Sequence, residues 1–134
     1  MLSLFPALLS YNLAVPLVFR LVIGVIFISY GYANITKNKE NKIAALARNN
    51  FVSPEKWLSA LAIVEILGGV LLIAGLYVQA TVLVLAMILI FGIIAKRKNP
   101  ENLTLSTETM FLLLLITFSL LFLGAGLYAV DLPL

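Results

Sequence analysis

The stretch from residue 57 to residue 77, WLSALAIVEILGGVLLIAGLY, contains one ionisable residue, Glu65, among apolar neighbours. At a rise of 1.5 Å per residue, a helix of this length covers the ~30 Å hydrocarbon core of a bilayer. A carboxylate near the middle of such a helix costs ~3 kcal/mol on insertion scales, so it is not expected to face lipid. The stretch therefore predicts a membrane-spanning helix whose acid lies inside a bundle of helices.

Composition places the rest of the chain in the membrane as well. Of the 134 residues, 63% are hydrophobic and 11% are charged, whereas soluble domains average ~25% charged residues. The sequence contains no cysteine and no histidine, which excludes disulfide relays, iron–sulfur clusters, haem with its usual ligands and His-built metal sites. We therefore expect an all-α, polytopic membrane protein without a metal site, a covalently bound cofactor or a nucleic-acid partner.

Four apolar stretches have the length and composition of membrane spans. A polar segment at 34–56 separates the first span from the second, and another at 96–106 separates the third from the fourth. A tight hairpin without charge joins the second span to the third. The sequence thus predicts a four-helix bundle that forms a single membrane domain over residues 1–134. The expected spans cover residues 14–33, 57–77, 78–95 and 107–130.

The polar segment at 34–56 carries apolar residues such as Ile43 and Leu46 at helical spacing. This pattern predicts a short amphipathic helix on the membrane surface, and a solvated loop is the alternative interpretation. Ser53 precedes a proline and an acid, which is a typical start of a helix. Ser106 directly precedes the last span. Both serines are therefore expected to cap helices.

Basic residues are distributed unequally between the two sides of this arrangement. The segments at 34–56 and 96–106 lie on the same side, and they contain eight of the nine Lys and Arg residues, namely Lys37, Lys39, Lys42, Arg48, Lys56, Lys96, Arg97 and Lys98. Cytoplasmic loops of membrane proteins carry the excess of basic residues. We therefore expect a multi-pass protein of the cell membrane, with both basic loops in the cytoplasm and both termini outside.

The ninth basic residue, Arg20, and the acid Glu65 lie deep inside predicted spans. Each shares a helix face with glycines, which allow a neighbouring helix to approach closely. The expected packing glycines are Gly24, Gly31, Gly68, Gly69, Gly75, Gly124 and Gly126. Because a hydrogen-bonded pair offsets much of the cost of burying two charges, we predict that Arg20 pairs with Glu65. Asp131, near the outer end of the last span, is the rival partner of Arg20, unless it is a solvated acid.

Tyr30 and Glu108 complete the candidate intramembrane polar site. Tyr30 lies toward the far end of the first span, where aromatic rings favour the membrane interface. Glu108 lies in the first turn of the last span, where the helix dipole stabilises an acid without any functional role. The candidate site therefore comprises Arg20, Tyr30, Glu65, Glu108 and Asp131, and no catalytic residue is assigned.

Several segments match one known family in order. The segment RLVIGVIFISYGYANI is similar to the pattern Arg-Leu-x-x-Gly-x-x-Phe-x-x-His-Gly, and VEILGGVLLIAGLYVQAT is similar to Val-Glu-x-x-Gly-Gly-x-x-Leu-x-x-Gly-Leu. An acid opens the fourth helix, and GAGLYAVD is similar to Gly-Pro-Gly-x-x-Ser-x-Asp. Over residues 14–131 the chain resembles the DoxX-like family of small four-helix membrane proteins. Tyr30 replaces the frequent histidine of the family, and Ala125 and Ala129 replace its proline and serine.

The resemblance implies a link to membrane redox systems, because members of the family are associated with thiosulfate oxidation that feeds quinone, with quinol oxidases and with oxidative-stress complexes. We favour an accessory or anchoring, non-catalytic subunit of a quinone-linked respiratory complex, whose partners are the lipid bilayer and other membrane subunits. The alternative is a membrane protein that binds a quinone or another small molecule and has oxidoreductase activity. A transporter is less consistent with the sequence, which has no inverted repeat.

Overall fold

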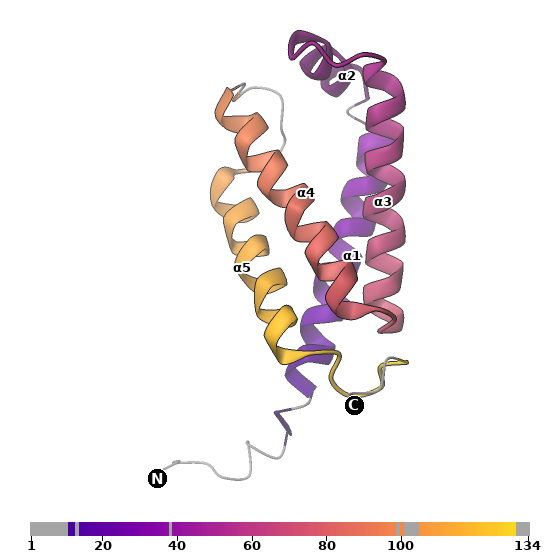
Figure 1. The fold of residues 1–134 in the computed structure, drawn as a ribbon, viewed down its shortest axis with the longest axis vertical. Coiled ribbons are helices and arrows are strands. Elements are labelled where there is room, and N and C mark those ends of the chain that lie inside the picture. The colour runs from indigo at the N-terminus through magenta and orange to yellow at the C-terminus, as the bar shows by residue number, and fades with distance from the viewer. Residues whose placement is uncertain (1–10, 13, 38, 99, 101–104, 131–134) are drawn as a thin grey trace.

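The computed structural model describes residues 11–12, 14–37, 39–98, 100 and 105–130 (Figure 1). The described part of the chain is all-α, which confirms the predicted class. Its five helices are α1 (Ala14–Thr36), α2 (Lys39–Arg48), α3 (Pro54–Ala74), α4 (Val78–Lys98) and α5 (Thr107–Leu123). Helices α1, α3 and α4 are long and apolar enough to cross a membrane, and α5 is a shorter apolar helix of 17 residues.

Helices α1, α3, α4 and α5 run alongside one another, and α2 lies at one end, against α1 and α3 (Figure 1). The most extensive contacts join α1 to α3 and α4 to α5, and the two pairs meet through α3 with α4 and α1 with α5. The start of α1, the α3–α4 connection and the end of α5 all lie at the end opposite α2. The predicted amphipathic segment is therefore a helix that lies at the end of the α1–α3 pair.

Glycines set the close approach of α1 to α3. A Cβ atom added at Gly24 would lie 2.8 Å from the carbonyl oxygen of Gly69, and one added at Gly31 would lie 2.8 Å from the carbonyl oxygen of Ala62. A Cβ atom at Gly69 would in turn lie 2.6 Å from the carbonyl oxygen of Gly24. The two backbones are thus in direct contact, which only residues without a side chain permit.

Apolar side chains fill the interior and also cover the outside. The core includes Ile23 and Phe27 from α1, Leu72 from α3, Leu85 from α4 and Leu120 from α5. Many large apolar side chains point outward, for example Val25, Leu67, Met87, Phe91 and Phe122. An outer surface of this kind suits lipid or the apolar face of another membrane helix.

The ends of α3 are fixed by backbone conformation rather than by the predicted serine cap. Ser53 has a positive φ of 59° and its side chain makes no capping hydrogen bond, so the side-chain capping role expected for Ser53 is wrong. Pro54 occupies the first turn, where its missing N–H group is not needed. At the other end, Gly75 adopts a left-handed conformation with φ 70° and donates its N–H to the carbonyls of Leu71 and Leu72.

Helix α5 begins as predicted and ends earlier than the expected span. The Ser106 side chain accepts a hydrogen bond from the Thr109 N–H at 3.1 Å, which confirms its predicted role as a cap. The helix ends at Leu123 rather than near residue 130, because Gly124 and Gly126 take positive φ values of 73° and 72°. The segment that follows, residues 124–130, turns back toward α3, and the Val130 N–H points to the Ala74 carbonyl at 3.5 Å.

Candidate functional site

Arg20 and Glu65 lie at different depths, so the prediction that they pair is wrong. Gly24 lies against Gly69, and continuing this antiparallel register by one turn of α1 places Arg20 beside Gly75, where a Cβ atom would collide with Arg20 Nη1. Gly75 is ~15 Å from Glu65 along the helix. The pairing fails because the Arg20 side chain extends toward Gly75 and the Leu127 carbonyl, away from Glu65.

The Arg20 guanidinium lies at the end of the bundle opposite α2, beside residues 124–130. The side chain is 0% exposed. Its Nη2 donates a hydrogen bond to the Leu127 carbonyl oxygen at 2.9 Å, and its Nε and Nη1 have no hydrogen-bond partner among the described residues. Gly75 leaves the space that the guanidinium occupies. Asp131, the rival partner of Arg20 in the sequence, lies outside the described residues.

Glu65 is held by an amide from α1 and a cation from α2. The residue is 7% exposed, and the Asn34 Nδ2 donates a hydrogen bond to its Oε2 at 2.6 Å. The Lys42 ammonium donates to the Asn34 Oδ1, so Asn34 bridges the carboxylate and the ammonium. Burial lowers the pKa of Lys42 below its ordinary value, and the Glu65 charge opposes that shift. Three elements therefore meet at Glu65.

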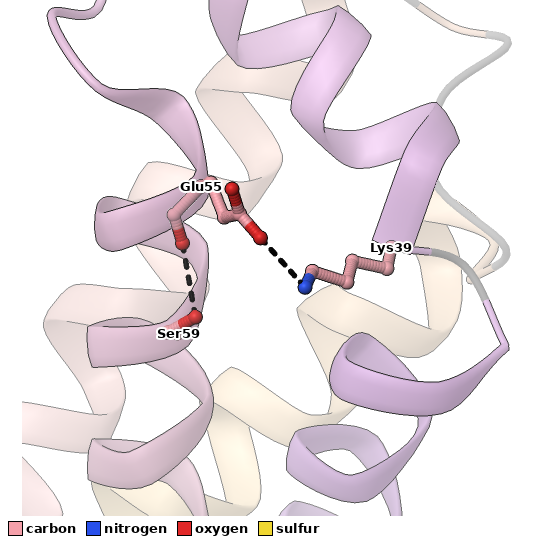
Figure 2. A network of polar contacts seen from close by, with 3 residues as sticks. All are labelled: Lys39, Glu55 and Ser59. Carbon is pink, nitrogen blue, oxygen red and sulfur yellow. Dashed lines mark hydrogen bonds and ion pairs between the residues drawn. The ribbon is translucent and has the colours of Figure 1, made fainter.

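A second contact joins α2 to α3 at the surface (Figure 2). Lys39 Nζ lies 2.7 Å from Glu55 Oε1, and the Ser59 hydroxyl donates to the Glu55 carbonyl at 3.0 Å one turn further along α3. The Lys39 and Glu55 side chains are 42% and 65% exposed. Because solvent screens an exposed ion pair, this contact positions α2 and contributes little to its stability.

The remaining candidate residues lie outside the groups of contacts around Arg20 and around Glu65. Tyr30 is half-buried and packs against the hydrophobic core. Glu108 is exposed in the first turn of α5, where the helix dipole accounts for an acid. Gly68 contacts the Leu85 side chain, whereas a Cβ atom at Gly124 would meet nothing within 4 Å. Gly124 is therefore required for its backbone conformation, and the expected helix contact at this position is not found.

Sequence reasoning missed the two residues that hold Glu65, Asn34 and Lys42. Asn34 lies three residues beyond Gly31, on the face of α1 that also carries Arg20. This spacing was the signal in the sequence that could have placed Asn34 toward the second span. Lys42 was grouped with the other basic loop residues. Its position three residues after Lys39, on the side of α2 that carries half-buried residues, distinguishes it only once the helix is placed.

The chemistry of these clusters is that of hydrogen bonding and charge compensation. Within the described ranges, no group of three Asp, Glu, His or Cys side chains is arranged to hold a metal ion. The guanidinium of Arg20 offers hydrogen-bond donors to an oxygen acceptor, and Glu65 offers a carboxylate that can hold a proton. Arg20 and Glu65 thus belong to two separate sites, one toward each end of α1.

One of three comparisons with known proteins finds a match. No curated protein and no solved structure matches the chain significantly. The family model named DoxX matches residues 15–97, which is more than half of the chain and includes α2, α3 and nearly all of α1 and α4. This match confirms the resemblance drawn from the sequence motifs. The chain belongs to the DoxX family.

Proposed function

We propose that this chain is an accessory or anchoring membrane subunit of a quinone-linked redox complex, and that α1, α3, α4 and α5 all cross the membrane. At 1.5 Å per residue, the 17 residues of α5 cover ~25 Å. This length is at the lower limit for a span, and the apolar composition of α5 supports its placement in lipid. Membership of the DoxX family supports the link to membrane redox systems.

The observation that supports the subunit role is that the charged groups are buried inside the bundle and apolar side chains cover its outside. Arg20, Asn34 and Glu65 are buried and are hydrogen-bonded to groups of the chain itself. Large apolar side chains cover the outer faces, for example Leu67 on α3 and Phe91 on α4. Buried charges that are engaged within the chain serve its architecture, and apolar outer faces are the surfaces through which membrane subunits associate.

Purification from native membranes in a mild detergent tests the subunit role. We expect a tagged chain to bring down the subunits of a quinone-linked oxidoreductase, together with quinone-dependent electron-transfer activity. A double variant that makes two outer apolar positions polar, Phe91→Ser with Leu67→Ser, should no longer bring down those subunits. Glu108→Gln, a control at an exposed position, should still bring them down. Recovery of the chain as an isolated monomer from membranes with full electron transfer would contradict the proposal.

A second function, binding of a quinone or another small molecule, is favoured by Arg20. Its Nε and Nη1 are buried and have no partner among the described residues. An unpaired buried donor is costly, and a carbonyl oxygen of a ligand would satisfy it. Tyr30 is the titratable hydroxyl nearest in sequence on the same helix. In this proposal, Arg20 positions the ligand carbonyl and the quinone carries the electrons.

Quinone titration of the purified chain tests this second function. A ubiquinone analogue with a short tail should bind to the parent protein, and Arg20→Met should weaken binding at least tenfold. Arg20→Lys, which keeps the charge and loses the planar donor set, should give an intermediate affinity. Equal affinity of the parent and Arg20→Met would contradict a role for Arg20 in ligand binding.

A further inference from the structure

Helix α2 is attached to the rest of the molecule by two polar contacts and by half-buried apolar side chains such as Ile43 and Leu46. None of its residues is buried. It contacts α1 and α3 through the Lys42–Asn34 hydrogen bond and the exposed Lys39–Glu55 ion pair. The hairpin that leads from α2 to α3 adds an edge-to-face contact between Phe51 and Trp57, with ring centroids 5.9 Å apart. An element with few buried apolar contacts separates from its neighbours at low cost.

The ionised form of Glu65, in contrast, is destabilised when its compensating charge is removed. A buried carboxylate is costly unless a cation compensates it or a proton neutralises it. The Lys42 ammonium is joined to Glu65 through Asn34, which accepts from Lys42 and donates to the carboxylate. Asn34 supplies a hydrogen bond to the carboxylate but no charge, so it cannot compensate the Glu65 charge by itself. The state of Glu65 therefore depends on whether α2 is in place.

We propose that α2 is a movable cover whose departure is coupled to the protonation of Glu65. When α2 lies on the bundle, Lys42 compensates the Glu65 carboxylate through Asn34. When α2 lifts, the Lys42 ammonium leaves with it, and the carboxylate takes one proton from the water that enters at this end. The O–H bond formed at Glu65 neutralises the buried charge, and no oxidant or reductant takes part.

The other charged groups near this end leave Glu65 and Lys42 as the pair that responds to pH. On α1, Asn34 is neutral and Arg20 lies at the opposite end of the bundle, and Lys37, directly after the helix, is exposed. On α2, Lys39 is engaged by Glu55 and Glu40 is exposed. The charges on α4 are confined to its last turn, at Lys96, Arg97 and Lys98. Acidification is therefore expected to lift α2 by protonating Glu65, because protonation removes the attraction for Lys42.

The distance between labels on α2 and α4 measures this motion. The chain has no cysteine, so spin labels can be attached to Ala44→Cys and Arg97→Cys, two exposed positions, in full-length protein in vesicles of zwitterionic phosphatidylcholine. On acidification, we expect the population to move from a short to a long distance. Glu65→Gln should show the long distance at every pH, because the amide mimics the protonated acid.

Two further variants keep the test decisive if Glu65→Gln does not fold. Lys42→Met removes the cation from a helix without buried residues, so the core remains intact and the pH-dependent step should disappear. Lys39→Met is the matched control on the same helix, and it should keep the step, because it leaves Lys42 and Glu65 in place. A distance that is independent of pH in the parent would overturn the proposal, and so would a step that survives in Lys42→Met.

Discussion

At the scale of single residues, the two charged side chains inside the bundle are hydrogen-bonded to a backbone carbonyl and to a side-chain amide. The Arg20 guanidinium bonds to a backbone carbonyl of residues 124–130, and the Glu65 carboxylate bonds to the amide of Asn34. Each arrangement requires a segment that arrives from far along the chain. Arg20 thus holds residues 124–130 at one end of the bundle, and Glu65, through Asn34, is the group that Lys42 of α2 meets at the other.

Double-mutant cycles on the free energy of unfolding distinguish this arrangement from a direct ion pair. Arg20→Met and Glu65→Gln should each destabilise the protein, and their effects should add within ~0.5 kcal/mol because the two side chains share no partner. Asn34→Leu with Glu65→Gln should depart from additivity by ~0.5–3 kcal/mol, since these side chains are hydrogen-bonded. Strong coupling of Arg20 to Glu65 would instead support a direct pair.

At the scale of helices, the α1–α3 interface depends on backbone contact and the α4–α5 interface depends on side chains. Gly24 and Gly69 lie against each other's backbone, which cannot move aside for a methyl group. Gly92 on α4 faces the end of the Met110 side chain on α5, which is flexible. Glycines on the two interfaces therefore differ in how much substitution they tolerate.

Substitution of these two glycines by alanine tests the difference. Gly69→Ala should cost ~1–3 kcal/mol of stability, because its methyl group would press on the Gly24 carbonyl. Gly92→Ala, the matched control, should be neutral or stabilise the protein by up to ~1 kcal/mol, since Met110 can move and alanine favours the helix. Unfolding in mixed detergent, followed by circular dichroism, measures both. Equal losses of stability would show that the α1–α3 backbones are not in contact.

The sequence predicted helices more reliably than it predicted which helices meet and at what level. Long apolar runs and the Ser106 cap are local signals, and the structure places helices at each of them. The Arg20–Glu65 pairing failed because the Arg20 side chain extends to the Leu127 carbonyl, a partner from far along the chain that no local pattern encodes. Lys42 was not recognised because its role exists only when α2 folds over the end of the bundle.

At the scale of the whole molecule, charge distinguishes one end from the other. The α2 end carries Lys39, Lys42 and Arg48 on α2 together with the basic last turn of α4. The opposite end carries the α3–α4 connection and the segment 124–130, in which the described residues include no basic side chain. This asymmetry is the basis for placing the α2 end in the cytoplasm.

Labelling of introduced cysteines tests this orientation. Ala44→Cys on α2 and Lys98→Cys at the end of α4 should react with a membrane-impermeant thiol reagent only after the cells are permeabilised. Tyr77→Cys, in the α3–α4 connection and 72% exposed, should react in intact cells. Reaction of Ala44→Cys in intact cells would reverse the proposed orientation.

The abundance of partner subunits in membranes that lack the chain tests the subunit role most directly. If the chain anchors a quinone-linked complex, its deletion should lower both electron transfer to quinone and the amount of the partner subunits. Both should recover on expression of the parent or of Arg20→Lys, which retains the buried charge. Loss of electron transfer with partner subunits at their normal level would contradict the subunit role and would indicate that the chain itself handles the quinone.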